Sequence, residues 1–130
     1  MFGRIVNRVR DMFAPRSVVV KNPRVISADE HRIDPALVSA EARATCEALK
    51  RRGFQAYIVG GAVRDLMLGV TPKDFDVATD ATPEQVKRCQ RRAVIIGRRF
   101  KLVHVIFGRE IIECSTFRAL EGAGQRKDAT

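Results

Sequence analysis

The sequence predicts one small domain of the α/β or α+β class, built around a small mixed β-sheet flanked by helices. Three observations support this prediction. The chain has 130 residues, a length that suits a single domain. Its composition, 45% hydrophobic and 30% charged, excludes collagen-like and wholly disordered chains. Helical and strand-like patterns alternate along the chain, and three strand-like segments then follow each other. Aromatic residues make up only 6%, so the core should be aliphatic.

The first elements of the domain are a long helix, a strand and a short helix. We expect order to begin near Ile33, because Asp34-Pro35 is a typical helix start, with an N-cap followed by proline. Apolar residues then recur at spacings of three and four, and Gly53 is the expected end of this helix. Residues 55–59 are β-branched and aromatic, which indicates a buried strand. Residues 62–68 form the next helix.

The second half of the domain is predicted to contain four strands and one helix. Residues 73–78 alternate polar and apolar side chains and indicate a strand. The next helix starts at Thr82 as N-cap, with Gln85 as its capping-box partner. Gly108-Arg109-Glu110 is typical of a hairpin turn. The remaining strands are expected at 93–96, 102–107 and 111–116.

The domain boundaries follow from where these patterns begin and end. We expect a basic N-terminal arm at 1–32, the folded domain at 33–120 and a polar tail at 121–130. No apolar run approaches the roughly 18 residues that a membrane-spanning helix needs, so no integral membrane segment is expected. A solvated arm is favoured over a mitochondrial presequence or a membrane-surface helix.

The charge balance points to a polyanionic partner. Lys and Arg number 24 and Asp and Glu 15, which gives a net charge of +9. Nucleic acid, a nucleotide and anionic lipid are all candidate partners. The three cysteines, Cys46, Cys89 and Cys114, are far apart and odd in number. This argues against a disulfide framework or a zinc site and fits a reducing, cytoplasmic location.

A diglycine between a strand and a helix is the first candidate binding feature. Gly60-Gly61 would let an anion approach the backbone N–H groups at the helix N-terminus. The alternative is a tight turn that needs a positive φ. Arg64 could bind a phosphate through two hydrogen bonds. It could equally form a structural ion pair, which is the favoured interpretation for Asp65.

Two carboxylates two residues apart are the second candidate feature. Asp74 and Asp76 would point to the same face of a strand, while Phe75 faces the buried layer. Adjacent carboxylates repel unless a cation lies between them, and hard oxygen ligands suit Mg²⁺. Glu113, isolated in an apolar strand, could be the third carboxylate of a two-metal site. The alternatives are a solvated Asp pair and an outward-facing Glu113.

A basic run without acidic residues extends from Lys87 to Lys101. We interpret it as a contact for RNA or a triphosphate, although such runs are usually solvated faces. His31 and His104 have no partner at ligand spacing, and His104 is interpreted as an ordinary strand residue. The candidate RNA-binding residues are Arg91, Arg92, Arg98, Arg99 and Lys101.

The motifs at 60–69 (GGAVRDLMLG) and 72–79 (PKDFDVAT) closely resemble the head signature of the class II CCA-adding enzyme and bacterial poly(A) polymerase family. The segments 97–105 and 113–118 look like the poly(A) polymerase branch, as does the lead-in from Glu30 to Phe54. The resemblance covers roughly residues 25 to 120. It implies a nucleotidyltransferase head fold, in which a small mixed sheet is flanked by helices.

The resemblance also implies an activity and a role for each site residue. An RNA 3′-hydroxyl would attack the α-phosphorus of ATP and release pyrophosphate, so ATP and an RNA 3′ end are the expected partners. Carried over from the family, the diglycine holds the triphosphate, two acidic residues bind Mg²⁺, a third is catalytic and an arginine contacts the nucleotide. In that order these residues are Gly60 and Gly61, Asp74 and Asp76, Glu113, and Arg118.

Family members continue beyond this head into a neck and RNA-binding helices. The sequence is therefore expected to represent a head domain alone, which would be weakly active or inactive by itself. Its parent enzyme is expected to be a polynucleotide adenylyltransferase that adds A tails. Two alternatives stay open: the head of a tRNA CCA-adding enzyme, and an inactive remnant that binds RNA. A membrane-surface protein is a weaker third.

Overall fold

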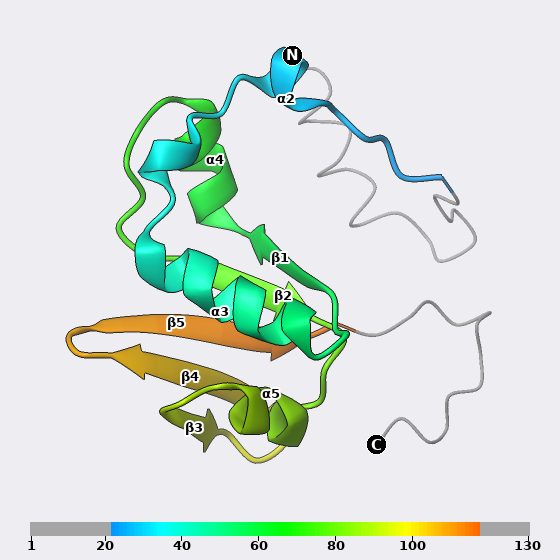
Figure 1. Ribbon diagram of the computed structural model, residues 1–130, viewed down its shortest axis with the longest axis vertical. Helices are drawn as coiled ribbons and strands as arrows, with labels where there is room; N and C mark the ends of the chain where they lie inside the picture. The colour runs from blue at the N-terminus through cyan, green and yellow to red at the C-terminus, as the bar shows by residue number, and fades with distance from the viewer. Residues whose placement is uncertain (1–21, 118–130) are drawn as a thin grey trace. The chain divides into compact units, whose positions relative to one another are not determined.

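The structure is a computed structural model that describes residues 22–117 (Figure 1). The chain divides into two units, Met1–His31 and Arg32–Thr130. In the first unit, the described residues end in the short helix α2 (Ala28–His31), where Arg24 and Glu30 approach to 3.9 Å. Every other element within residues 22–117 belongs to the second unit. Within the described residues, no helix has the length and apolar character needed to cross a membrane.

The second unit is built on a five-stranded mixed sheet, which confirms the predicted fold class. The strand order is β1-β2-β5-β4-β3, and β2 and β5 are parallel while every other neighbouring pair is antiparallel. Because β2 pairs with β5, the sheet brings together segments that are distant in sequence. The strands are β1 (Ala56–Val59), β2 (Asp76–Thr79), β3 (Ala93–Ile96), β4 (Leu102–Phe107) and β5 (Glu110–Thr116).

Two helices pack on one face of this sheet. Helix α3 (Ala40–Arg51) contacts β1, β2 and β5, while α5 (Pro83–Cys89) contacts β3, β4 and β5 (Figure 1). The core lies between the helices and the sheet, and it is aliphatic as expected. Its largest fully buried apolar side chains are Leu49, Val77, Val86, Val103, Val105 and Ile112. The short helix α4 (Gly61–Met67) follows β1 and contacts it.

The expected single helix after Ile33 is wrong in one respect, because the structure divides it in two. Asp34 caps only a 3₁₀ turn, η1 (Pro35–Leu37), by accepting a hydrogen bond from the N–H of Ala36 at 3.0 Å. Val38 is then extended, the conformation that a β-branched residue favours. Ser39 caps α3 by accepting from the N–H of Ala42 at 3.1 Å. Two competing capping residues thus break the chain into two helical pieces.

Helix α5 begins as predicted. The Thr82 hydroxyl accepts from the N–H of Gln85 at 3.2 Å, and the Gln85 side chain accepts from the N–H of Thr82 at 2.9 Å. This reciprocal capping box satisfies two backbone N–H groups that a helix start leaves without partners.

The strand predicted at 73–78 starts later, at Asp76, and runs to Thr79. Its neighbour β1 ends at Val59, which pairs with Asp76. The chain then turns away at Gly60, where φ is +78°, so β1 offers no partner to the residues before Asp76. Phe75 is nevertheless buried, as expected, and Asp74 is exposed.

Candidate functional site

A row of polar side chains crosses the sheet on the face opposite to the helices. Asp76, the first residue of β2, is in register with Glu113 on β5, and Glu113 is in register with His104 on β4. All three are half-buried, whereas Val77 and Cys114, which follow in the chain, point into the core. We call Asp76, Glu113 and His104 the carboxylate row. The structure thus places two of the three predicted acidic residues on adjacent strands.

Electrostatic repulsion acts on Asp76. Burial raises the pKa of this carboxyl, and the nearby Glu113 and Asp74 carboxylates raise it further. Ionised Asp76 therefore costs more free energy in the folded state than in the unfolded chain. A cation at this position would remove that cost. Asp74 itself is exposed, and no group of three or more His, Cys, Asp or Glu side chains within 22–117 is close enough to hold a metal ion jointly.

The diglycine lies directly beside Asp76. Gly60 is the N-cap of α4, with φ +78° and ψ −152°, a backbone conformation almost restricted to glycine. A β-carbon at this position would lie 3.2 Å from Oδ2 of Asp76. The two motifs that the sequence analysis singled out therefore meet at one point, where the absence of a side chain keeps the approach to the Asp76 carboxylate open.

In this structure Arg64 forms an ion pair with Asp65, which is the structural alternative given above for this side chain. Its Nε and Nη2 atoms each donate to Oδ1 of Asp65 at 3.2 Å. The side chain is 71% exposed, and a β-carbon on Gly61 would lie 3.2 Å from Nη2. The guanidinium is therefore next to the diglycine and accessible. The other predicted nucleotide contact, Arg118, lies outside the described residues.

The contact between His104 and Glu113 was not predicted from the sequence. Nε2 of His104 lies 3.3 Å from Oε2 of Glu113. The signal that could have revealed the pair is the hairpin turn at Gly108 and Arg109, which places 107 opposite 110 and therefore 104 opposite 113. His104 is thus a hydrogen-bonding partner of the candidate catalytic glutamate, as well as a strand residue.

The basic run lies away from the carboxylate row. Arg91 and Arg92 lie between α5 and β3, and Arg98 and Arg99 lie in the turn between β3 and β4. Because β5 and β4 separate β2 from β3, this edge lies about 14 Å from Asp76, at roughly 4.8 Å per strand. Lys101 pairs with Glu84 at 3.7 Å. The run therefore follows one edge of the sheet and does not reach the carboxylates.

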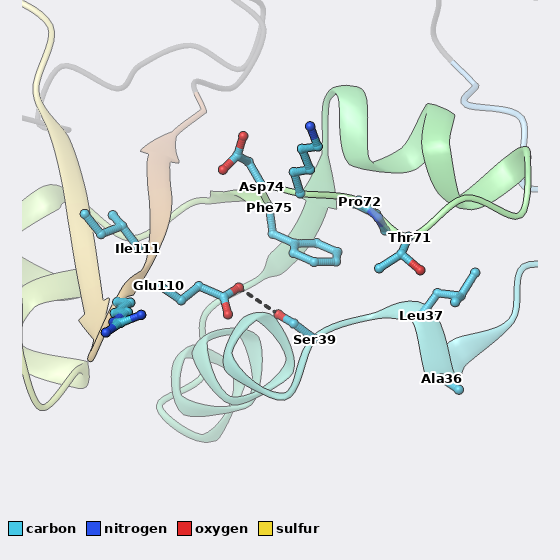
Figure 2. A pocket seen from close by; sticks show the side chains of 11 residues that line it. Ala36, Leu37, Ser39, Thr71, Pro72, Asp74, Phe75, Glu110 and Ile111 are labelled. Carbon is cyan, nitrogen blue, oxygen red and sulfur yellow. Dashed lines mark hydrogen bonds between the residues drawn. The ribbon is translucent and has the colours of Figure 1, made fainter.

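A pocket of about 650 Å³ borders Asp74 and was not anticipated from the sequence. It lies between η1, the loop before β2 and the turn between β4 and β5 (Figure 2). Ser39 donates a hydrogen bond to Oε2 of Glu110 at 3.1 Å across this pocket (Figure 2). Burial raises the pKa of Glu110, and the Ser39 hydrogen bond partly offsets that rise. Lys73 and Arg109 also line it.

Comparisons with known proteins show which family the chain resembles. A family model described as "Poly A polymerase head domain" matches residues 56–130. The "Poly(A) polymerase I" of Haemophilus influenzae is 55% identical over 96 residues, which are 73% of this chain and 21% of that protein. The "Poly(A) polymerase I" of Salmonella typhi is 42% identical over 136 residues, which cover 100% of this chain and 29% of that protein.

Among solved structures, the crystal structure of the Bacillus stearothermophilus CCA-adding enzyme in complex with CTP matches with a TM-score of 0.57 and 38% identity. The match covers 65% of this chain and 21% of that chain. The chain thus spans between about a fifth and less than a third of the length of these relatives.

Proposed function

Because the chain belongs to the poly(A) polymerase head domain family, we propose that it forms the head of a template-independent RNA nucleotidyltransferase. In this proposal AMP passes from ATP to an RNA 3′ end: the 3′-oxygen bonds to the α-phosphorus, the hydroxyl proton leaves, and pyrophosphate departs. The observation that carries the proposal is the position of Asp76, between Gly60 on one side and Glu113 on the other.

Nucleotidyl transfer typically uses divalent metal ions, and the residues present suit Mg²⁺. The donors are hard carboxylate oxygens, and burial together with the charges of Glu113 and Asp74 raises the pKa of Asp76. In the proposal Asp74 and Asp76 hold Mg²⁺ together with triphosphate oxygens, an arrangement this ion favours. Such an ion supplies charge neutralisation at the phosphates and a lower pKa for the attacking hydroxyl.

The remaining roles fall to side chains and backbone around this point. Gly60 and Gly61 leave room for the triphosphate. The exposed Arg64 lies beside the diglycine, close enough to contact a triphosphate bound there. Glu113 adds negative charge beside Asp76 and is held by His104. We propose that Arg118 also contacts the nucleotide. The proposed RNA backbone contacts are Arg91, Arg92, Arg98, Arg99 and Lys101 along the β3 edge.

Within this class, we propose A-tail addition. The poly(A) polymerase relatives are more similar in sequence than the CCA-adding enzyme, and segments 97–105 and 113–118 point the same way. The CCA-adding alternative is supported by the matched structure with CTP. A cytoplasmic location is part of the proposal, because the free thiols of Cys46, Cys89 and Cys114 suit a reducing compartment.

Activity is tested by exchanging the head of the Haemophilus influenzae poly(A) polymerase I for this chain. The chimera is offered an unstructured RNA and a tRNA without its CCA end, with ATP and CTP both present. We expect a lengthening A-only tail on the unstructured RNA. CTP incorporation followed by one terminal A would assign the head to CCA addition. An inactive chimera that still binds Mg-ATP would instead support the inactive remnant. The Asp76→Asn chimera serves as the control.

The hydrogen bond between His104 and Glu113 predicts that a substitution at position 104 changes metal binding. Leucine at 104 removes the hydrogen bond to Glu113 and leaves that carboxylate freer to move. Partners behind a metal-site carboxylate typically contribute 10–100-fold to affinity. We expect His104→Leu to weaken Mn²⁺ binding in the presence of ATP by about 10-fold. His104→Gln, which keeps a donor, should largely restore it.

Mn²⁺ binding is measured by electron paramagnetic resonance on the 130-residue chain. The control is Ile106→Val, which changes a neighbouring side chain on the same face of β4. If leucine and glutamine at position 104 behave alike, the hydrogen bond does not position Glu113.

A further inference from the structure

A second, smaller pocket lies on the helical side of the sheet. It has a volume of about 230 Å³ and is lined by Arg52, Phe54, Gln85, Arg88 and Cys89. Arg52 follows the last residue of α3, and the three residues from 85 to 89 belong to α5. These helices cover the face opposite to the carboxylate row, so the pocket is separate from the proposed catalytic site.

The polar groups that line this pocket are donors. Arg52 and Arg88 have no carboxylate within 4 Å and no side-chain hydrogen bond anywhere in residues 22–117. Gln85 uses its Oε1 to accept from the N–H of Thr82 at 2.9 Å, and its Nε2 amide group has no protein partner in that range. No acidic residue lines the pocket. A ligand that only accepts hydrogen bonds and carries negative charge therefore fits, and a phosphate group meets both conditions.

The apolar part of the lining further limits the class of ligand that fits this pocket. Phe54 is half-buried and packs against the core, so its ring is held in place by the fold. An aromatic wall beside two guanidinium groups is the combination that binds single-stranded nucleic acid, because bases stack on the ring while phosphates bind the cations. An acidic peptide would use the cations but not the aromatic wall.

Further cations connect this pocket with the edge of the sheet. Lys87 lies on α5 beside Arg88, and Arg91 and Arg92 continue toward β3. The carbonyl of Arg92 accepts a hydrogen bond from the N–H of Ile106 at 3.0 Å, so the chain at Arg92 lies beside β4, the strand that carries His104. Positive charge thus continues from the pocket on the helical side to the β3 edge of the sheet. Beyond this edge lies the opposite face, which carries the carboxylate row.

We propose that Arg52, Arg88, Gln85 and Phe54 form a binding site for a nucleotide of single-stranded RNA, on the opposite side of the sheet from the carboxylate row. The RNA would run from this site along Arg91 and Arg92 toward the open face. Binding at the pocket requires neither metal nor ATP; only the direction of the strand toward the carboxylate row rests on the proposed function.

The test measures binding of a fluorescently labelled 12-nucleotide oligo(A) to the 130-residue chain in EDTA, over a range of salt concentrations. For Arg52→Gln/Arg88→Gln we expect Kd to rise about tenfold at low salt and the slope of log K against log salt to flatten by about 1.4, at roughly 0.7 per contact. Arg52→Lys/Arg88→Lys keeps the charges, so its slope should stay close to that of the parent. Phe54→Leu keeps the apolar packing and should weaken binding without changing the slope.

The matched control is Arg24→Gln/Arg43→Gln, which removes the same two charges. Arg24 already pairs with Glu30, and Arg43 donates to the carbonyl of Pro35 at 2.9 Å, so neither is as available to a phosphate. Equal effects of the two glutamine pairs would overturn the proposal, as would polyglutamate of equal charge competing as well as oligo(A). Should the double variant fail to fold, Arg88→Gln alone is measured, and an unchanged Kd would overturn the proposal. Because EDTA is present, failure of the proposed catalytic function leaves this assay unaffected.

Discussion

Asp76→Asn is expected to abolish Mg-ATP binding by this chain and, at the same time, to raise the stability of the metal-free protein at pH 7. Losing a partner behind a metal ligand already costs 10–100-fold in affinity, so losing a ligand itself should cost about 100-fold or more. The gain in stability comes from removing a repulsion between two carboxylates. Asparagine keeps the shape of the side chain but removes a charge that faces Glu113 across neighbouring strands.

The size of that gain is expected to be about 0.2–1 kcal/mol, the range for a cross-strand charge pair. Calorimetric titration with Mg-ATP and urea unfolding without metal measure the two effects. The control is Glu47→Gln, which removes one carboxylate from the exposed surface of α3. This control should change neither quantity. A parent-like affinity in Asp76→Asn, or an unfolded Asp76→Asn protein, would contradict the proposed role of Asp76.

The same residue predicts a pH dependence with a definite sign. The pKa of Asp76 is raised in the folded state, so the folded protein holds this proton more tightly than the unfolded chain does. Its contribution to stability is fully present below the unfolded pKa and is lost as pH rises through the folded pKa. Between the unfolded and the folded pKa of Asp76, the free energy of unfolding of the Asp76→Asn protein should therefore fall less than that of the parent protein. Metal affinity should rise over the same interval, because Mg²⁺ competes with the proton.

The sequence was sufficient for the fold class and for the local elements that have strong end signals. The capping box of Thr82 and Gln85 and the hairpin turn at Gly108 are local chemistry, and both are present in the structure. Local signals also misled where two of them competed. Asp34 and Ser39 each cap a helical segment, and only the structure shows that the chain uses both.

The candidate site depended on strand order, which local patterns do not contain. Glu113 lies beside Asp76 because β5 pairs with β2, a contact between residues 37 positions apart. From the residues alone this adjacency was a hypothesis, and the family resemblance made it specific. The same strand order separates the basic run from Asp76 by two intervening strands, although the run is closer to Asp76 in sequence than Glu113 is.

Gly60→Ala is expected to reduce Mg-ATP affinity more than tenfold, since a displaced ligand should cost at least as much as a lost partner behind it. Gly60 combines φ +78° with ψ −152°, and alanine there costs about 1–3 kcal/mol in backbone strain. In addition, the new β-carbon would lie 3.2 Å from Oδ2 of Asp76. The carboxylate must move by a few tenths of an ångström, and the space proposed for the triphosphate becomes smaller.

The matched control is Gly69→Ala. It separates the effect of backbone strain from the effect of a β-carbon that obstructs the Asp76 carboxylate. Gly69 also has a positive φ, +75°, but a β-carbon there would meet nothing within 4 Å. Gly69→Ala should therefore lose stability, by about 1 kcal/mol, and bind Mg-ATP like the parent. Urea unfolding gives the stabilities, and calorimetric titration of the folded proteins gives the affinities. If both alanine variants bind Mg-ATP equally well, the diglycine acts only as a turn, and its proposed place beside the triphosphate is wrong.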